Sequence, residues 1–186
     1  MKVDPAPNDR IRQFEIQILP HVPDLYRVAR RLGVTPSDAE DLVQETCLRA
    51  FRTQDQLRRT DAARTWLFAV FRSVFLRFTA KLRSTGSASS IPLEVLPDLA
   101  RWDDFRETGV EWATLEDVRA AILRLPLAYR EALLLAHVAG FSYRELARIL
   151  EVPLGTVMSR LFRARRLVRE ALRETSPRAC SMERHP

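Results

Sequence analysis

The spacing of apolar residues along the chain predicts helices. Apolar positions recur three or four residues apart, which is the period of a helix that buries one face, and no alternating strand pattern stands out. In the first half of the chain this pattern occupies four segments: Ile11–Ile18, Leu25–Leu32, Ala39–Phe51 and Trp66–Phe78. Pro20 ends the first segment. The fourth is apolar on nearly all sides, so we expect it to lie at the centre of a helical bundle.

Residues with strong positional preferences mark the ends of these helices. Gly33 is well placed as the C-cap of the second helix, and Ser37 followed by Glu40 predicts a capping box for the third. The polar stretch 53–60 predicts a loop, after which Asp61 is the expected N-cap of a helix that runs to about residue 83. The apolar face of the third helix is predicted to contain Ala39, Leu42, Val43, Thr46, Ala50 and Phe51.

A connector with a different composition separates this bundle from a second one. Residues 84–90 consist of Ser, Thr, Gly and Ala only, which is typical of a linker, and the stretch then becomes acidic at Asp103 and Asp104. Helical spacing returns from about Trp112. One apolar stripe, which Pro126 ends, is formed by Leu115, Val118, Ile122 and Leu125. A second stripe covers Leu127–Val138 and ends at Gly140.

The C-terminal part of the chain predicts a helix-turn-helix, with Ser142–Leu150 as its first helix and Leu154–Arg169 as its second. Ser142 and Glu145 form a further predicted capping box, and residues 151–153 provide a short turn. The second helix has an inward face made of Val157, Leu161, Ala164 and Val168. A different face gathers Thr156, Ser159, Arg160, Arg163 and Arg166.

This hydroxyl and arginine face suits a helix that enters the major groove of DNA. Short hydroxyl side chains allow close approach to phosphates and base edges, and arginines reach the backbone or the edges of guanines. The free N–H groups at the start of the helix also suit a phosphate. The alternative is an ordinary amphipathic helix with a solvated basic face, but the two caps and the short turn favour DNA binding.

The distribution of charge is consistent with a polyanionic partner. The chain has 30 basic and 24 acidic residues, for a net charge of +6, and nearly all of its basic residues are arginines. The net charge is +5 over residues 1–85, −4 over 86–113 and +5 over 114–186, so a polyanion would meet two separate basic blocks. High-GC codon usage also enriches arginine, and composition alone leaves both explanations open.

Catalytic, metal-binding and membrane-spanning classes find no support in the sequence. His21, His137 and His185 are scattered without partner spacing, and no glycine-rich phosphate loop or metal-ligand cluster occurs, so we expect no catalytic site, cofactor or metal. Cys47 and Cys180 form no disulfide framework, and Cys47 is expected to be a small buried hydrophobe. Because neither a run of about 18 apolar residues nor a signal-peptide core is found, the expected location is the cytoplasm.

Three segments of the chain resemble the sigma factors of bacterial RNA polymerase, in their extracytoplasmic-function group. Gly140–Arg166 (GFSYRELARILEVPLGTVMSRLFRARR) resembles region four, whereas Asp38–Phe51 (DAEDLVQETCLRAF) and Arg64–Phe75 (RTWLFAVFRSVF) resemble region two. The resemblance implies an all-α fold of two small helical bundles joined by a flexible linker, with the helix-turn-helix in the C-terminal bundle. The expected divisions are region two at 10–84, an acidic linker at 85–113, region four at 114–174 and a tail at 175–186.

The resemblance also implies which residues contact RNA polymerase and promoter DNA. Region two would dock on the clamp of the β′ subunit through Asp38, Asp41, Gln44 and Glu45. It would recognise and melt the minus-ten element through Arg64, Trp66, Arg72, Ser73 and Arg77. Trp66, Phe71 and Phe75 supply aromatics for a flipped base, although the apolar helix favours a core position for each. Region four would contact the minus-thirty-five element through Tyr143, Arg144, Thr156, Met158, Ser159, Arg160, Phe162, Arg163 and Arg166.

The implied function is that of an alternative sigma factor. It would bind core RNA polymerase through the β′ clamp and the β flap, direct initiation at specific promoters, respond to stress, and be controlled by an anti-sigma factor, without catalytic activity or membrane contact of its own. A stand-alone helix-turn-helix regulator with an N-terminal sensor or dimerisation bundle is the alternative. Two departures from the family pattern concern DNA recognition: Phe71-Arg72-Ser73 replaces an Ala-Arg-Asn triplet, and Met158 stands where some members have an arginine.

Overall fold

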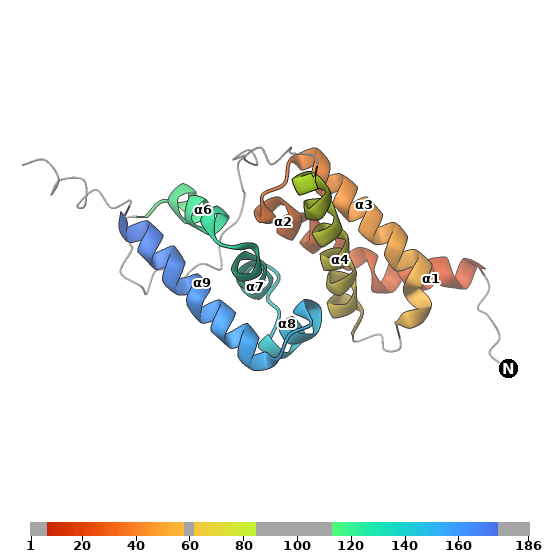
Figure 1. The fold of residues 1–186 in the computed structure, drawn as a ribbon. Coiled ribbons are helices and arrows are strands. Elements are labelled where there is room, and N and C mark those ends of the chain that lie inside the picture. Colours follow the sequence, from red (N-terminus) through yellow and green to blue (C-terminus); the bar gives the residue numbers. More distant parts are fainter. Residues whose placement is uncertain (1–6, 58–61, 85–112, 175–186) are drawn as a thin grey trace, which may run out of the picture. The chain divides into compact units, whose positions relative to one another are not determined.

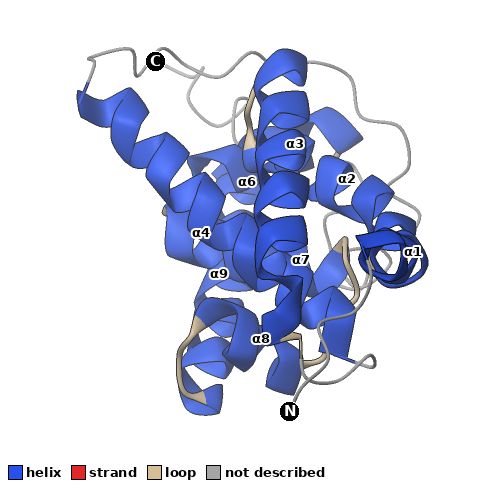
Figure 2. Cartoon of the chain, turned by 90° about the vertical axis from the view of Figure 1, so that its right-hand side faces the viewer, coloured by secondary structure: helices blue, strands red, loops and turns tan. Residues whose placement is uncertain are grey.

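A computed structural model describes residues 7–57, 62–84 and 113–174 of the chain. These residues form helices joined by short loops, and no strand occurs among them (Figures 1 and 2; Figure 2 colours the helices blue). They divide into two compact helical units. The all-α, two-bundle fold that the sequence predicts is confirmed. Asp61, Trp112, most of the predicted linker and the predicted tail lie outside the described residues, so the domain boundaries stay predictions.

The described residues of the first unit form four α-helices and two short 3-10 turns. In chain order these are α1 (Pro7–Gln17), η1 (Leu19–His21), α2 (Val22–Leu32), α3 (Pro36–Thr53), η2 (Gln54–Gln56) and α4 (Ala63–Ser84). α3 packs against both α2 and α4, and Gly33 ends α2 in the left-handed conformation that favours glycine, with φ of 96°. The start of the predicted loop at 53–60 is helical instead, because α3 includes Thr53 and η2 follows it directly.

The core of the first unit comes from the stripes that the spacing predicts, with one exception. Leu25 and Val28 of α2, Leu42 of α3 and Phe68 of α4 are buried. Phe51 is 36% exposed, so its assignment to the buried face of α3 is wrong. It lies near the end of α3, where its only described aromatic neighbour is Phe14 of α1, in an edge-to-face contact with ring centroids 5.4 Å apart.

The start of α3 differs from the predicted capping box. Thr35, not Ser37, is the N-cap: its backbone is extended, and its Oγ1 accepts a hydrogen bond from the backbone N–H of Asp38 at 3.1 Å. The Thr35 hydroxyl in turn donates to the carboxylate of Asp38 at 2.6 Å. The physical reason is Pro36, which is favoured at the first helical position because it has no N–H to satisfy, and which therefore moves the cap to the preceding residue.

Two single substitutions test this cap. Thr35→Ala is expected to lower the free energy of unfolding by about 1 kcal/mol, because the N–H of Asp38 loses its acceptor. Ser37→Ala, an exposed change one residue into the helix, is expected to leave stability within about 0.5 kcal/mol. Urea unfolding followed by circular dichroism measures both. Equal losses in the two variants would contradict the assignment of Thr35.

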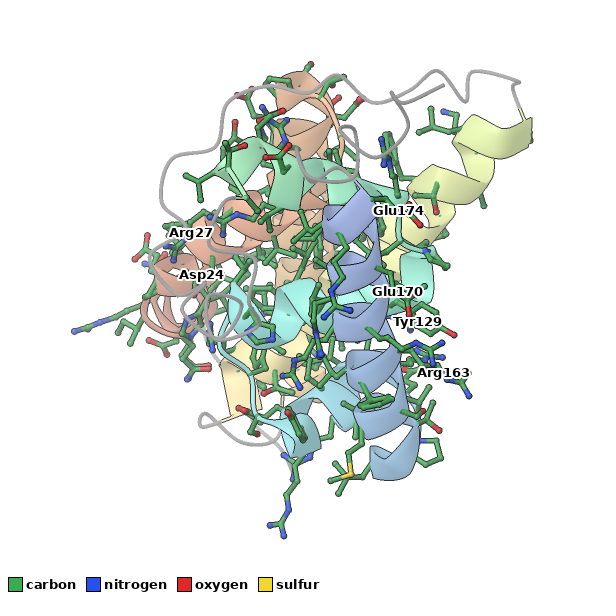
Figure 3. All side chains as sticks on the ribbon, turned by 90° about the vertical axis from the view of Figure 1, so that its left-hand side faces the viewer. Asp24, Arg27, Tyr129, Arg163, Glu170 and Glu174 are labelled. Carbon is green, nitrogen blue, oxygen red and sulfur yellow. The ribbon has the colours of Figure 1, made fainter. Side chains whose placement is uncertain are left out.

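A charged cluster joins α2 to α4. Asp24 of α2 accepts hydrogen bonds from Arg27, one turn further along the same helix, and from Arg64 of α4 at 3.0 Å (Figure 3 labels Asp24 and Arg27). The Arg64 guanidinium also lies 5.8 Å from the ring centroid of Phe68, a cation–π contact. Partial burial alone would raise the pKa of Asp24, but the hydrogen bonds and charges of the two arginines outweigh it and hold that pKa below its ordinary value.

This pKa shift predicts how acid affects the first unit. A carboxylate whose pKa is lowered by folding stabilises the fold above its unfolded pKa, near 4, and that stabilisation is lost as the pH falls through the folded value. Asp24→Asn is therefore expected to cost roughly 1 kcal/mol at pH 6 and progressively less below about pH 4. Urea unfolding at pH 6 and pH 3 measures the difference, with Asp41→Asn, an exposed carboxylate on α3, as the control. A cost for Asp24→Asn that is independent of pH would contradict the role of the ion pairs.

The second unit contains α6 (Leu115–Arg124), α7 (Leu127–His137), α8 (Tyr143–Leu150) and α9 (Leu154–Glu174). α9 packs against α6 and α7, and it continues beyond the predicted end at Arg169, where the buried Leu172 extends its inward face. Leu115 is 61% exposed, so its place in the predicted stripe is wrong. It is the first residue of α6 and directly follows the N-cap Thr114, which forms a capping box with Asp117.

Candidate nucleic-acid interface

The first helix of the predicted helix-turn-helix has the expected start and a sharp end. Ser142 is the N-cap of α8: its Oγ accepts from the N–H of Glu145, and its own N–H donates to the Glu145 carboxylate at 2.8 Å, so this capping box is confirmed. Glu151 ends the helix in the left-handed region with φ of 51°, which turns the chain within three residues into α9. Leu146 and Ile149 are buried, as their spacing predicts.

The second helix places its polar residues away from the core. Its predicted inward face is buried in full: Val157, Leu161, Ala164 and Val168 are at most 1% exposed. On the other side Ser159, Arg163 and Arg166 are exposed, and Thr156 and Arg160 are half-buried. Ser159 donates its hydroxyl hydrogen to the carbonyl of Thr156 at 3.0 Å, so toward a ligand its Oγ offers lone pairs. Arg166 pairs with Glu170 at 3.5 Å on the exposed surface.

Three further contacts hold two arginines of α9 against neighbouring helices. The Nη1 of Arg163 lies 3.5 Å from the hydroxyl of Tyr129 in α7; Figure 3 labels both residues. Arg165 lies within hydrogen-bond distance of His137 at 3.3 Å and donates to the hydroxyl of Tyr143 at 3.4 Å, which joins α9 to α7 and α8. Sequence reasoning did not single out Tyr129 or Arg165. In the sequence Arg165 looks the same as Arg163 and Arg166, and only its position on the helix turns it toward α7 and α8.

The N-terminus of α9 is open to a ligand. The N–H groups of Thr156 and Val157 donate to the carbonyl of Pro153, whereas the earlier N–H groups of a helix have no partner within it. A Cβ added at Gly155 would meet nothing within 4 Å, and the first turn contains no acidic residue. This end of the helix therefore combines free N–H groups, the positive end of the helix dipole and room for close approach, which suits a phosphate.

Gly155→Ala separates folding from ligand approach. Because the added methyl meets only open space, and alanine favours helix over glycine, the stability of the second unit is expected to stay the same or rise by up to about 1 kcal/mol. Affinity for double-stranded DNA is expected to fall roughly twofold to tenfold, since the methyl prevents close approach of a phosphate to the N–H groups. Fluorescence anisotropy with a labelled duplex measures affinity, and thermal unfolding provides the control. Unchanged DNA affinity would contradict a phosphate at this position.

Exposed polar side chains also gather on one side of α3. Asp41, Gln44 and Glu45 are exposed at helical spacing, as expected of a docking surface. Leu48, which is 53% exposed, continues the same surface one turn further, and sequence reasoning did not assign it a role. Asp38 differs from the other three predicted residues: it is half-buried, and its carboxylate takes part in the cap of α3.

The predicted minus-ten residues of α4 divide between its surface and its interior. Ser73 and Arg77 are exposed, Trp66 and Arg72 are half-buried, and Arg64 is engaged in the ion pair with Asp24. The core position favoured for Phe71 and Phe75 is confirmed, because they are 2% and 3% exposed and their rings stack 6.1 Å apart. Trp66 is the one described aromatic of that set with side-chain surface left for a base.

Other chemistry finds little support among the described residues. No group of three or more histidine, cysteine or acidic side chains in them is arranged to hold a metal ion. Cys47 is half-buried, and burial raises the pKa of its thiol, which disfavours the reactive thiolate. None of the helices in the described part of the chain is long and apolar enough to cross a membrane.

Comparison with known protein families gives two matches in chain order. Residues 18–85 match the family model "Sigma-70 region 2", and residues 115–168 match "Sigma-70, region 4". The first range contains α2, α3 and α4, and the second begins with α6 and ends within α9. The two candidate surfaces, on α3 with α4 and on α8 with α9, therefore each lie within a matched region.

Individual relatives agree with the family models. The chain is 34% identical over 149 residues to the ECF RNA polymerase sigma factor EcfG of Rhodopseudomonas palustris, covering 80% of this chain and 78% of that protein. It is 32% identical over 166 residues to the ECF RNA polymerase sigma factor SigE of Mycolicibacterium smegmatis, and spans 60% of the length of that relative.

Two solved structures with a similar fold are structures of complexes. One is the sigma factor RpoE of Bartonella quintana in complex with the anti-sigma factor NepR, with a TM-score of 0.69 and 28% identity over 86% of this chain and 96% of that chain. Another is CnrH in complex with the cytosolic domain of CnrY, with a TM-score of 0.61, 25% identity and coverage of 89% and 91%.

Proposed function

This chain belongs to the ECF sigma factors of RNA polymerase, and we propose that it binds core RNA polymerase and directs it to a specific set of promoters. The observation that carries the proposal is the pairing of two different surfaces on one chain. An exposed acidic surface on α3 suits a protein partner, and an exposed arginine surface on α9 suits DNA.

The second unit is proposed to contact the minus-thirty-five element. α9 would enter the major groove, with its first turn against a phosphate and Ser159 and Arg163 facing base edges. The further contacts proposed are Tyr143, Arg144, Thr156, Met158, Arg160, Phe162 and Arg166. The exposure of Arg144, Ser159 and Arg163 supports this assignment, and the Tyr129 contact of Arg163 would hold that guanidinium in place before DNA binds.

The first unit is proposed to bind the β′ clamp and the minus-ten element. Asp41, Gln44 and Glu45 would face the clamp, and the exposed Leu48 would add an apolar contact to that surface. On α4 the exposed Ser73 and Arg77, with Trp66 and Arg72 beside them, would follow the non-template strand. Arg64 would act on DNA only indirectly, through the position that its ion pair with Asp24 gives to the start of α4.

The proposed control is by an anti-sigma factor. The RpoE and CnrH structures are of complexes with the anti-sigma factor NepR and with the cytosolic domain of CnrY, respectively, and the similarity of fold supports the same kind of partner here. The protein would have no catalytic activity of its own and would act in the cytoplasm, where core polymerase and the chromosome are found. A stand-alone regulator would not require the region two match or the acidic surface on α3.

Reconstitution with core RNA polymerase tests the proposal. The purified chain is mixed with core enzyme, passed over a size-exclusion column, and the complex is assayed for transcription from a genomic promoter library. Co-elution in a one-to-one complex and transcripts that depend on the added chain are expected. Binding to DNA without binding to core polymerase would instead identify a stand-alone regulator.

A further inference from the structure

An apolar stripe lies exposed on α9, outside the face that builds the core. Leu154 is 39% exposed, Met158 51% and Phe162 65%. The three residues are four positions apart, so they follow one side of the helix with about 6 Å of rise between neighbours. The inward face of the same helix is already filled by five buried residues, so the fold does not need the stripe for packing.

The charge of the residues around the stripe indicates the kind of partner that it binds. Between Leu154 and Arg169 the helix carries five arginines and no acidic residue. Arg163 follows Phe162 directly, Arg166 lies one turn further along the helix, and both are exposed. The open N-terminus of α9 precedes Met158 by one turn. The positive charge of this helix surface attracts a polyanion, and the apolar stripe within it suits a polyanion that also exposes apolar groups.

The major groove of DNA contains one such apolar group, the C5 methyl of thymine. We propose that Met158, with Phe162 one turn further, recognises thymine methyl groups in the minus-thirty-five element. This inference rests on the proposed function, and it adds a base preference to the helix that enters the groove. Methionine suits the role because its flexible thioether adapts to a small apolar partner, whereas it cannot donate hydrogen bonds to a base edge.

The geometry of the stripe limits where these thymines lie. The 6 Å between Met158 and Phe162 along the helix axis corresponds to about two base-pair steps of 3.4 Å. The two side chains therefore contact methyl groups on base pairs at most about two steps apart. Leu154 lies at the first turn beside the proposed phosphate contact, so we assign the methyl recognition to the two residues further along.

Deoxyuridine provides the test, because it differs from thymidine only by the methyl group. Holoenzyme made from core polymerase and the full chain is used to select binding sequences from a promoter library randomised over the minus-thirty-five region. Each thymine that is enriched is then replaced by uracil, one at a time. For the wild-type chain, the uracil substitution at the position facing Met158 is expected to weaken holoenzyme binding about fourfold, the effect of losing one buried methyl.

Variants assign that effect to the side chain. Met158→Ala is expected to bind the thymine and uracil promoters equally, and Met158→Leu, which keeps an apolar side chain, is expected to retain most of the difference. Leu115→Ala, which changes another exposed apolar residue, on α6, is the control and should keep the full difference. Because these residues are exposed, thermal unfolding of each variant is expected to match the wild type.

Several outcomes would overturn the inference. One is a selected minus-thirty-five sequence without thymine, and another is wild-type binding that does not change with uracil. A third is a Met158→Ala variant that keeps the full sensitivity to uracil, which would assign thymine preference to DNA shape or to another residue. Failure of the proposed function is distinguishable from all three, because a chain that is not a sigma factor selects no promoter sequence when mixed with core polymerase.

Discussion

Core RNA polymerase is expected to bind the Asp41→Ala/Glu45→Ala double variant about tenfold more weakly than the wild-type chain. Both carboxylates are exposed on the same side of α3, and they lie one helical turn apart. Neither side chain is in the core, so the loss comes from contacts with the partner and not from unfolding. Titration of labelled chain with core polymerase measures the dissociation constant, and repeating it at higher salt should reduce the difference between variant and wild type.

A matched variant separates the position of these charges from their number. Asp9→Ala/Glu15→Ala removes two exposed carboxylates from α1 of the same unit and changes the net charge by the same amount. Its affinity for core polymerase is expected to equal that of the wild type. If both double variants lose affinity equally, the acidic surface of α3 is not a docking site and general charge governs the association. Leu48→Ala is expected to weaken binding as well, at any salt concentration, because its contribution is apolar.

The second large effect is expected from Arg163→Ala. Loss of the guanidinium should reduce promoter binding by about 1–3 kcal/mol, or roughly fivefold to 150-fold, if it contacts a guanine edge in the major groove. Binding to core polymerase should remain unchanged, because Arg163 lies on α9 and not on the docking surface of α3. Single-round transcription from a promoter with both elements, together with the core-binding titration, measures the two properties separately.

The control for this variant is another arginine of the same helix. Arg173→Ala removes the same charge from the last turn of α9, about 15 Å further along the helix axis. It is expected to lower promoter binding only slightly, through general electrostatics. Tyr129→Phe, which removes the hydroxyl that Arg163 contacts, is expected to lower binding by less than Arg163→Ala and to leave base preference unchanged. Loss of core binding in Arg163→Ala would contradict the assignment to DNA.

Local signals in the sequence predicted the local structure well. The capping box at Ser142, the C-cap at Gly33 and the buried face of α9 depend on residues within one or two helical turns, and all are present. The same kind of signal failed at α3, where two neighbouring hydroxyl residues compete for one cap. The outcome there depends on Pro36, whose preference for the first helical position outweighs the predicted Ser37–Glu40 pair.

Features that depend on distant parts of the chain could not be predicted from spacing. Arg64 appeared in the sequence as a DNA contact, but its partner Asp24 lies 40 residues earlier and is brought to it only by the packing of the first unit. Phe51 and Leu115 fit an apolar stripe, yet the neighbouring helices do not cover them. Conversely, the motif alone assigned Met158 to the DNA-contacting residues. Its place in the structure, exposed on an arginine-rich helix, is what indicates a thymine methyl group as its partner.

Mapping of transcription start sites tests the central claim most directly. Core RNA polymerase is incubated with fragmented genomic DNA, with and without the chain, and the 5′ ends of the transcripts are sequenced. A sigma factor is expected to produce a set of start sites that occurs only with the added chain and shares two upstream elements at fixed spacing. Start sites that are the same with and without the chain, or that share no upstream elements, would contradict its assignment as a promoter-specificity factor.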